Sequence, residues 1–372
     1  MIALPAAASL VLWPTSPSRE AASQFPRPMP PLSVTTLVSG LDTPWDLAWG
    51  PDGAIWVTER PGRVSRVTPT TGAITRVGEV EVVEVSESGL MGMAFHPDFA
   101  AEPYVYVAHS YQAGGGIRNR LVRMRYDGTR LGAPEVLLDA IPGNSNHNGS
   151  RLAFGPDGML YMTTGDAANR SSAQDLGSLA GKVLRLTPRG SPAPGNPFGT
   201  AVHSYGHRNA QGIVFHPETG TLYVSEHGQQ DNDEVSRVER GGNHGWPQVS
   251  GFCDGDNGGE QEYCARNRVI EPLTAWTPTV GISGLDYYGG ALIAEWKGSL
   301  LVTSLRGAAL YRLRLSSDGR RVVEREELFR GEYGRLRDVM VGPGGEVYLA
   351  TSNRDGRGRP AADDDRILVV RP

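Results

Sequence analysis

The chain has 372 residues and a formal net charge of −5, from 36 basic and 41 acidic residues. This slightly acidic balance offers no electrostatic attraction to nucleic acid or to an anionic membrane, so a small molecule is the expected partner. With 48 glycines, 27 prolines, 8% aromatic and 21% charged residues, the composition is typical of an all-β protein with many tight turns and little helix.

The first 30 residues differ in composition from the rest. An apolar run from Ile2 to Trp13 passes into sequence rich in proline and serine, as in an export signal that lacks its basic N-terminal region. The run is too short to span a bilayer, so we expect no transmembrane segment. Residues 1–33 are predicted to be a signal or disordered N-terminal segment, or to reflect a misassigned start. Export would place the protein in the periplasm or outside the cell.

From residue 34 onward, a short phrase recurs six times: apolar residues, a turn that often contains proline, and an alternating strand. Its copies begin at Trp45, Gly92, Arg151, Gly212, Gly284 and Arg337. Repeats with two strands around a turn are the signature of propeller blades. Further strand candidates lie between them at 63–68, 121–126, 182–187, 309–315 and 366–370. We predict an all-β, six-bladed β-propeller over residues 34–372, with about four antiparallel strands per blade.

The last strand candidate, Arg366–Val370, is expected to complete a blade begun by the first strand of the domain. Closing the ring in this way would leave fewer exposed sheet edges. The three aspartates before it, Asp363–Asp365, are expected to form a solvated turn.

Two segments, 165–200 and 228–271, are too long to be hairpin turns. Long loops in a compact domain are usually functional or disordered. The second segment contains both cysteines of the chain, Cys253 and Cys264. They could close a small disulfide in an extracytoplasmic protein, or remain two free structural cysteines; their spacing does not indicate zinc.

The third repeat is flanked by a candidate acid–base pair. It is entered through 144–151, which contains His147, and left through Asp166. Because a strand–turn–strand unit returns to the end at which it began, these two residues are expected to be neighbours. A neutral imidazole beside a carboxylate can act as a general base. A loop histidine bonded to backbone is the alternative.

Four arginines flank the later repeats. Arg208 precedes the fourth, Arg306 follows the fifth, and Arg335 and Arg337 introduce the sixth. They should converge from three blades on one face of the ring, where the guanidiniums would repel one another unless an anion lay between them. We expect a bound polyanion, most simply a cofactor or substrate with several carboxylates. Surface ion pairs with nearby acidic residues are the alternative.

The loop after the fourth repeat offers oxygen ligands. Residues 230–234 are Gln-Asp-Asn-Asp-Glu, and residues 242–247 are Gly-Asn-His-Gly-Trp-Pro. Hard cations such as Ca²⁺ prefer mixed sets of carboxylate and carbonyl oxygens. The spacing is not that of an EF-hand, so the pattern by itself is not specific.

Together these motifs make the chain resemble the soluble quinoprotein glucose dehydrogenase and aldose sugar dehydrogenase family. Its members are six-bladed propellers that bind pyrroloquinoline quinone (PQQ) and calcium. The resemblance runs from about Leu37 to the C-terminus. Its most specific pieces are segments 88–99, 147–166, 181–186, 206–217, 225–235, 243–247 and 334–339.

The resemblance implies roles for the residues around the third and fourth repeats. His147 would be the base that takes the proton of the sugar's anomeric hydroxyl while hydride passes from C1 to the quinone. Asp166 would support it. Arg208, with Asn209 beside it, would polarise the quinone carbonyl and stabilise the negative charge that develops on its oxygen.

The resemblance also implies how the cofactor's carboxylates would be held. Arg306, Arg335 and Arg337 would pair with them, so the cofactor would be the polyanion that the arginines lead us to expect. Arg306 stands where the family has lysine, so the charge is kept. Glu87 falls where the glucose enzyme has a glutamine that contacts the cofactor. Its charge would sit badly beside an anionic cofactor unless it were protonated or turned toward His147 or an arginine.

Calcium would lie at two places if the resemblance holds. The main-chain carbonyls of Gly228 and Gln229 would bind a Ca²⁺ that also touches the quinone and adds Lewis-acid polarisation. A second Ca²⁺, as in the aldose branch of the family, would lie near Glu234 and the backbone at His244.

The implied function is a calcium-supported quinoprotein dehydrogenase that oxidises the anomeric carbon of aldoses to lactones and passes the electrons to an external acceptor. Two alternatives stay open: a metal-dependent propeller lactonase or esterase, and a non-enzymatic binding propeller. The first would not need arginines on three blades, and the second would have no reason to pair His147 with Asp166. A monomer is expected, because no long apolar surface segment stands out.

Overall fold

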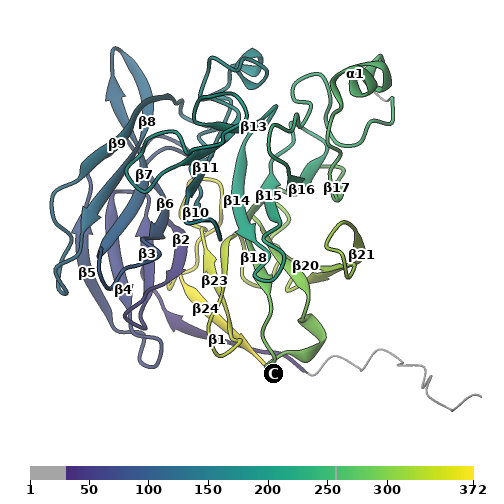
Figure 1. Ribbon diagram of the computed structural model, residues 1–372. Coiled ribbons are helices and arrows are strands. Elements are labelled where there is room, and N and C mark those ends of the chain that lie inside the picture. Colours follow the sequence, from purple (N-terminus) through teal and green to yellow (C-terminus); the bar gives the residue numbers. More distant parts are fainter. Residues whose placement is uncertain (1–30, 256–257) are drawn as a thin grey trace, which may run out of the picture. The chain divides into compact units, whose positions relative to one another are not determined.

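The computed structural model describes residues 31–255 and 258–372, which form six four-stranded antiparallel sheets. The innermost strand of each sheet contacts the innermost strands of the sheets before and after it, so the sheets close a ring of blades (Figure 1). The predicted six-bladed β-propeller is confirmed. Most of the predicted signal segment, residues 1–30, lies outside the described residues.

Each blade runs from an innermost strand at the axis to an outermost strand at the rim. The first blade contains β2 (Pro44–Trp49), β3 (Ile55–Glu59), β4 (Arg63–Val67) and β5 (Ile74–Glu79). The second contains β6 (Leu90–Phe95), β7 (Tyr104–Ala113), β8 (Gly116–Arg125) and β9 (Glu135–Pro142). The third contains β10 (Leu152–Phe154), β11 (Leu160–Thr164), β12 (Lys182–Leu186) and β13 (Val202–Tyr205).

The remaining blades follow the same plan. The fourth contains β14 (Ala210–Phe215), β15 (Leu222–Glu226), β16 (Asp233–Val238) and β17 (Thr274–Trp276). The fifth contains β18 (Ile282–Tyr288), β19 (Ser299–Ser304), β20 (Ala309–Leu315) and β21 (Val322–Leu328). The sixth contains β22 (Leu336–Val341), β23 (Val347–Thr351), β24 (Ile367–Arg371) and β1 (Ser33–Val38). Within residues 31–255 and 258–372, three short helices, η1 (Arg170–Ala173), α1 (Glu260–Asn267) and η2 (Ala294–Trp296), lie in connections between strands.

The ring is closed by the two ends of the domain. Strand β1 pairs antiparallel with β24, with Val34 opposite Val370, and Figure 1 shows the purple first strand beside the yellow last one. The predicted closing strand, Arg366–Val370, is thus confirmed with a shift of one residue. Closure leaves β1 as the outer strand of the sixth blade, so the chain's first strand depends on its last for hydrogen bonds.

The second strand of a blade is buried because neighbouring blades cover both of its faces. In β3, Trp56 is fully buried and makes edge-to-face contacts with Phe95 and Tyr126, at ring-centroid distances of 5.3 and 5.0 Å. Asp52 in the preceding turn accepts a hydrogen bond from the Trp56 indole at 3.1 Å. Gly53 takes the positive φ of 76° that this turn requires. The repeated turn therefore also positions the aromatic side chain that packs the blade.

Segment 228–271 contains more regular structure than expected. Strand β16 begins at Asp233, inside the stretch interpreted as a ligand-bearing loop, and helix α1 follows it. Cys253 and Cys264 form a disulfide, which is the first of the two alternatives. The disulfide ties α1 to the loop before it, so this helix of eight residues does not depend on its own hydrogen bonds alone.

The interpretation of Asp363–Asp365 as a solvated turn holds for Asp363, which is exposed, but is wrong for the other two. Asp364 and Asp365 are 2% and 0% exposed. Asp364 accepts a hydrogen bond from the backbone N–H of Ala361 at 2.8 Å, and Asp365 accepts one from that of Asn353 at 2.5 Å. Buried backbone donors need such partners, so these carboxylates hold the connection between β23 and β24.

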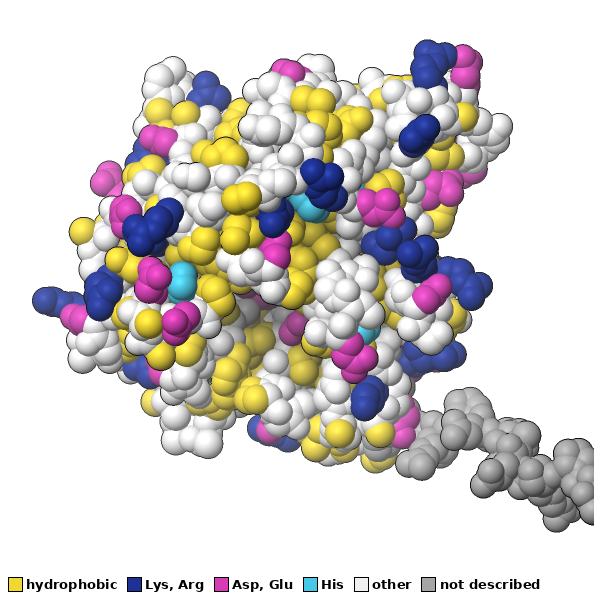
Figure 2. Space-filling model, in the orientation of Figure 1, with side chains coloured by type: hydrophobic (Ala, Val, Ile, Leu, Met, Phe, Trp, Pro, Cys, Tyr) yellow, Lys and Arg dark blue, Asp and Glu magenta, His cyan; other side chains and the backbone are white. Residues whose placement is uncertain are grey.

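Acidic and basic side chains are interspersed over the face seen in Figure 2. That face therefore shows no continuous basic surface of the kind that binds nucleic acid. Within the described ranges, no helix is both long enough and apolar enough to cross a bilayer.

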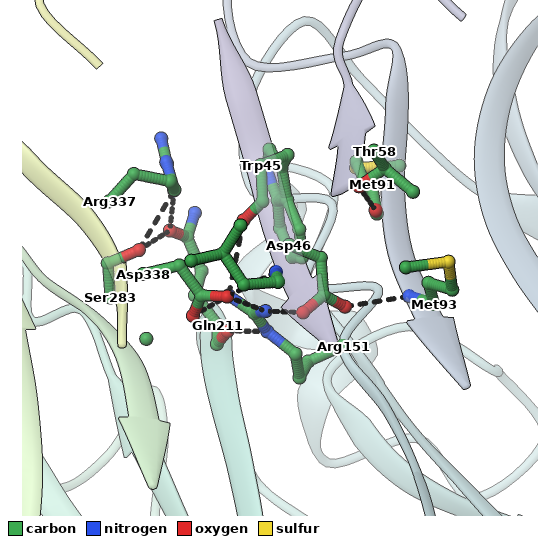
Figure 3. Close-up of polar contacts among 12 residues, drawn as sticks. Trp45, Asp46, Thr58, Met91, Met93, Arg151, Gln211, Ser283, Arg337 and Asp338 are labelled. Carbon is green, nitrogen blue, oxygen red and sulfur yellow. Dashed lines mark hydrogen bonds and ion pairs between the residues drawn. The ribbon is translucent and has the colours of Figure 1, made fainter. Parts of the chain in front are cut away.

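A buried ion cluster joins the innermost strands near the axis (Figure 3). Arg151, which directly precedes β10, makes ion pairs with Asp46 of β2 and Asp338 of β22, the latter with Nη2 3.0 Å from Oδ1. Asp46 also accepts a hydrogen bond from the backbone N–H of Met93 in β6, and Asp338 one from that of Leu47 in β2, both at 2.7 Å. One guanidinium and two carboxylates thus connect blades one, two, three and six.

Replacing Arg151 by alanine should lower the free energy of unfolding by about 3–5 kcal/mol, because two buried carboxylates would lose their cation. Arg314→Ala is the matched control, since the Arg314–Glu324 ion pair lies at the surface, with side chains 50% and 44% exposed. It should cost less than about 1 kcal/mol. Urea unfolding followed by tryptophan fluorescence measures both. Equal losses would show that the cluster does not hold the ring.

Candidate active site

Loops at one end of the ring enclose a cavity of about 390 Å³, within the range of small-molecule sites. Of the twelve residues singled out from the sequence, all but Asp166, Glu234 and His244 line it. The lining residues from that set are Glu87, His147, Arg208, Asn209, Gly228, Gln229, Arg306, Arg335 and Arg337. The structure therefore brings together residues that are up to 250 positions apart, from Glu87 to Arg337.

His147 and Asp166 are neighbours, as expected. His147 Nδ1 lies 2.8 Å from Asp166 Oδ1, and the two side chains are 18% and 1% exposed. The backbone N–H of Ala168 also donates to Oδ1 at 2.8 Å, and the Trp246 indole donates to Oδ2 at 2.9 Å. These donors fix the carboxylate. Since Nδ1 is engaged by Asp166, Nε2 is the His147 nitrogen that is left for a ligand.

The backbone around His147 is shaped by two glycines. His147 has a φ of 57° and Gly149 one of 58°, in the left-handed region that only a supporting environment maintains. A Cβ on Gly165 would lie 1.9 Å from the carbonyl oxygen of His147, so only glycine allows the end of the third repeat to approach this loop. The N–H of Gly149 donates to Asn209 Oδ1 at 3.0 Å, which ties the loop to the fourth blade.

Arg208 is held by its backbone and by an aromatic ring. Its N–H donates to the Glu226 carboxylate, and Nη1 donates to the carbonyl of His227 at 3.1 Å. The guanidinium lies over the Trp246 ring, 5.4 Å from the centroid. Its buried Nε has no hydrogen-bond partner among the described residues, and burial lowers the pKa of Arg208 below its ordinary value. Trp246 contacts both Asp166 and Arg208; it lies in a motif singled out from the sequence, but no role was predicted for it.

Arg337 is a buried cation that makes no ion pair with an acidic residue in the described part of the chain. It is 3% exposed, and Nη1 donates to Gln211 Oε1 at 2.7 Å and to Ser283 Oγ at 3.0 Å (Figure 3). Its Nε has no partner among the described residues. Burial lowers the pKa of Arg337 to about 9. An anion in the cavity would offset this unfavourable burial of charge.

The other two predicted arginines differ in their partners. Arg335 makes an ion pair with Asp355, with Nη2 2.7 Å from Oδ2. Arg306 is exposed and makes one hydrogen bond, from Nη1 to Thr279 Oγ1 at 3.3 Å. Among the described residues, only one of the four arginines therefore has a carboxylate within ion-pair distance. The expected convergence from three blades is confirmed.

Glu87 is balanced by an arginine that sequence reasoning missed. Arg357, in the loop between β23 and β24, donates from Nη1 to Glu87 Oε1 at 2.7 Å. The backbone N–H of His147 donates to Glu87 Oε2 at 3.3 Å. Burial alone would raise the pKa of Glu87, but nearby positive charge and these hydrogen bonds lower it to about 2. Because burial lowers the pKa of His227, Arg357 is the cation that matters at neutral pH. The glycines on either side of Arg357 indicate a loop but carry no signal for this contact.

The predicted calcium positions fall in two places. Gly228 and Gln229 line the cavity, and no donor to either carbonyl oxygen is found in the described part of the chain. Glu234 and His244 lie outside the cavity lining. The His244 ring stacks on His207 at a centroid distance of 4.3 Å, and neither of its nitrogens has a partner among residues 31–255 and 258–372. In those same ranges, no group of three or more His, Cys, Asp or Glu side chains is placed to hold a metal ion.

Fold and site together define a six-bladed propeller with a His–Asp pair and several arginines around one cavity. Residues 41–367 match the family described as Glucose / Sorbosone dehydrogenase, and the chain belongs to this family.

Individual relatives agree over nearly the whole chain. The solved structure of PQQ-bound aldose sugar dehydrogenase from Streptomyces coelicolor is 39% identical and covers 92% of this chain and 99% of its own, with a TM-score of 0.81. Quinoprotein glucose dehydrogenase B of Acinetobacter calcoaceticus is 29% identical, over 99% of this chain and 93% of its own. The soluble aldose sugar dehydrogenase of Escherichia coli, solved in the apo-form, is 26% identical, with a TM-score of 0.80 and coverage of 92% and 100%.

The Glu87–Arg357 pair should couple energetically in a pH-dependent way. In a double-mutant cycle with Glu87→Gln and Arg357→Gln, urea unfolding should give a coupling of about 1 kcal/mol at pH 7, since Arg357 is half exposed and screened. The folded-state pKa of about 2 lies below the ordinary 4.5. The carboxylate therefore contributes stability that is present above about pH 4.5 and lost as pH falls toward 2. Because the folded-state carboxylate is still ionised at pH 3, the coupling should persist there and decline only as the pH approaches 2. A coupling near zero at pH 7 would contradict the ion pair.

Proposed function

We propose that this protein is a calcium-supported quinoprotein that oxidises the anomeric carbon of aldoses to lactones and passes the electrons to an external acceptor. The observation that carries the proposal is the cavity itself. Five arginines line it, and three of them, Arg208, Arg306 and Arg337, have no carboxylate within ion-pair distance among the described residues. A ligand with several carboxylates would supply the missing negative charge. Relatives named for PQQ and for sugar dehydrogenase activity support the same reading.

The residues present fit PQQ. Arg306, Arg335 and Arg337 would hold its carboxylates, and Arg208 with Asn209 its quinone oxygen. The buried Nε atoms of Arg208 and Arg337, and Nε2 of His227, have no hydrogen-bond partner in the described ranges; all three residues line the cavity, where a ligand could accept or donate the missing hydrogen bonds. When bound, the cofactor supplies a quinone that accepts hydride from carbon.

A Ca²⁺ ion also fits the site. The carbonyls of Gly228 and Gln229 accept no hydrogen bond from the described residues, and such hard oxygens suit calcium. Ligand atoms would complete the coordination. A second Ca²⁺ near Glu234 and the carbonyl of His244 belongs to the same proposal.

The chain's own residues would carry the proton chemistry. His147 Nε2 would take the proton of the anomeric hydroxyl, while Nδ1 donates to Asp166. The carboxylate holds the tautomer that leaves Nε2 unprotonated, and it stabilises the imidazolium that then forms. Trp246 and the N–H of Ala168 keep Asp166 in place. Arg208 would donate to the oxygen on which negative charge develops.

No observation favours the metal-dependent hydrolase or the binding propeller that the sequence left open, and neither would account for the arginines without acidic partners. The disulfide between Cys253 and Cys264 supports a place outside the cytoplasm, since disulfides persist mainly in oxidising compartments. We include a periplasmic or secreted location in the proposal, and a monomeric state remains a prediction.

Reconstitution tests the proposal directly. Purified apoprotein mixed with PQQ and Ca²⁺ should show the absorbance of bound cofactor and should reduce an artificial dye when an aldose is added. The control is apoprotein mixed with PQQ in the presence of a calcium chelator and without added Ca²⁺, and it should not reduce the dye. No spectral change at micromolar PQQ would rule out the quinoprotein.

Two substitutions separate the proposed roles. His147→Ala should lower kcat by about 10²–10⁴-fold, the contribution typical of a general base, and leave PQQ binding nearly intact. Arg208→Ala should weaken both. His216→Ala, after β14 at the opposite end of the ring, serves as the control and should change neither. Turnover by His147→Ala at the wild-type rate would disprove the assignment of the base.

A further inference from the structure

A second cavity, of about 540 Å³, adjoins the site cavity. The two cavities share four lining residues, namely Leu305, Arg306, Arg335 and Arg357. These side chains come from the loops after β19, before β22 and after β23, so the second cavity lies between the fifth and sixth blades at the same end of the ring. The shared side chains form the boundary between the two spaces.

The second cavity is rich in positive charge. Five arginines line it, against two carboxylates. Three of the arginines have acidic partners: Arg335 and Arg357 at 2.7 Å and Arg366 at 3.0 Å. Arg306 and Arg359 make no ion pair with any residue of the described part of the chain. Two guanidiniums are therefore available to an anion.

Arg359 distinguishes the second cavity from the first. It is exposed and lies in the loop between β23 and β24, and it lines the second cavity but not the first. If a polyanionic cofactor engages Arg306 and Arg335 from the site cavity, Arg359 remains unpaired on the other side of the boundary. A second, separate anion would find its cation there.

We propose that the second cavity binds the external electron acceptor as a small anion, next to the site cavity and apart from the sugar. This inference rests on the proposed function. Oxidation of one aldose to its lactone releases two electrons and two protons. Two molecules of a one-electron acceptor such as ferricyanide would take one electron each, and the protons would pass to solvent. The volume suits a small molecule, and the shared arginines place it beside the space where the electrons arise.

Charge reversal at Arg359 tests the inference in steady-state kinetics. At low ionic strength, Arg359→Glu should raise the KM for ferricyanide, a trianion, about tenfold, because attraction becomes repulsion at short range. The KM for the sugar should not change. With phenazine methosulfate, a cationic acceptor, the KM should stay the same or fall. Added salt should shrink the ferricyanide effect, and Arg359→Lys should restore wild-type behaviour.

The matched control is Arg320→Glu. Arg320 is exposed, makes no ion pair with a described residue, and lies in the β20–β21 hairpin at the other end of the ring. The substitution makes the same change in net charge. Equal effects of Arg359→Glu and Arg320→Glu on ferricyanide would overturn the inference, and so would an equal loss with both acceptors.

A binding measurement gives a readout that does not depend on turnover. Hexacyanocobaltate(III) has the charge and shape of ferricyanide but is not reduced. Calorimetric titration of the cofactor-loaded protein should show it binding, about tenfold more weakly to Arg359→Glu and unchanged to Arg320→Glu. No binding to the wild-type protein, or binding that Arg359→Glu leaves unaltered, would overturn the inference.

Failure of the proposed function would look different. An aldose added without any acceptor should reduce the bound cofactor, as seen in its absorbance, in wild type and in Arg359→Glu alike. If that reduction is absent from the wild type, the quinoprotein proposal fails. If it is present but the acceptor does not respond to Arg359, only the acceptor site fails.

Discussion

The guanidinium of Arg151 is the point on which the ring depends. It is buried near the axis, where it makes ion pairs with Asp46 and Asp338, and its Nε donates to the carbonyl of Gln211 at 2.8 Å. Burial and the neighbouring carboxylate of Asp338 raise the pKa of Asp46, whereas Arg151 lowers it. Such a cluster is stable only when every member has partners. Five of the six blades, all but the fifth, supply them, so the cluster forms only in the closed ring.

The same cluster explains why the cavity above it is positively charged. Arg337 and Asp338 are adjacent in sequence. An ion pair between Asp338 and an arginine of the cavity would have neutralised positive charge in the site. Asp338 is instead engaged by Arg151, and the partners that Arg337 has among the described residues are the neutral Gln211 and Ser283. Gln211 contacts both arginines, through its carbonyl and its side chain. Arg151 therefore neutralises Asp338, and the positive charge of Arg337 in the cavity remains uncompensated.

The periodic sequence predicted the architecture well, because each repeat encodes its own turn and buried strand, as at Gly53 and Trp56. The His147–Asp166 pair and the arginines followed from the geometry of a blade, which returns its two ends to one mouth. The contact of Arg357 with Glu87 did not, because it joins loops 270 residues apart whose conformations have no period. Trp246 and the buried Asp364 and Asp365 were missed or misread for the same reason: nothing local distinguishes their environment from a solvated turn.

The loops at the cavity end of the ring differ from blade to blade, and as a result three arginines line both cavities. Arg306, Arg335 and Arg357 face both cavities, so an anion bound in one lowers the positive potential in the other. Binding of a polyanion in the site cavity would therefore weaken, but not abolish, the attraction of the second cavity for an anion. Arg359 lines that cavity and makes no ion pair with a residue in the described part of the chain. The site cavity would then bind its polyanion tightly, and the second cavity would bind an exchangeable anion weakly. This difference in affinity depends on which arginines have carboxylate partners rather than on the number of arginines.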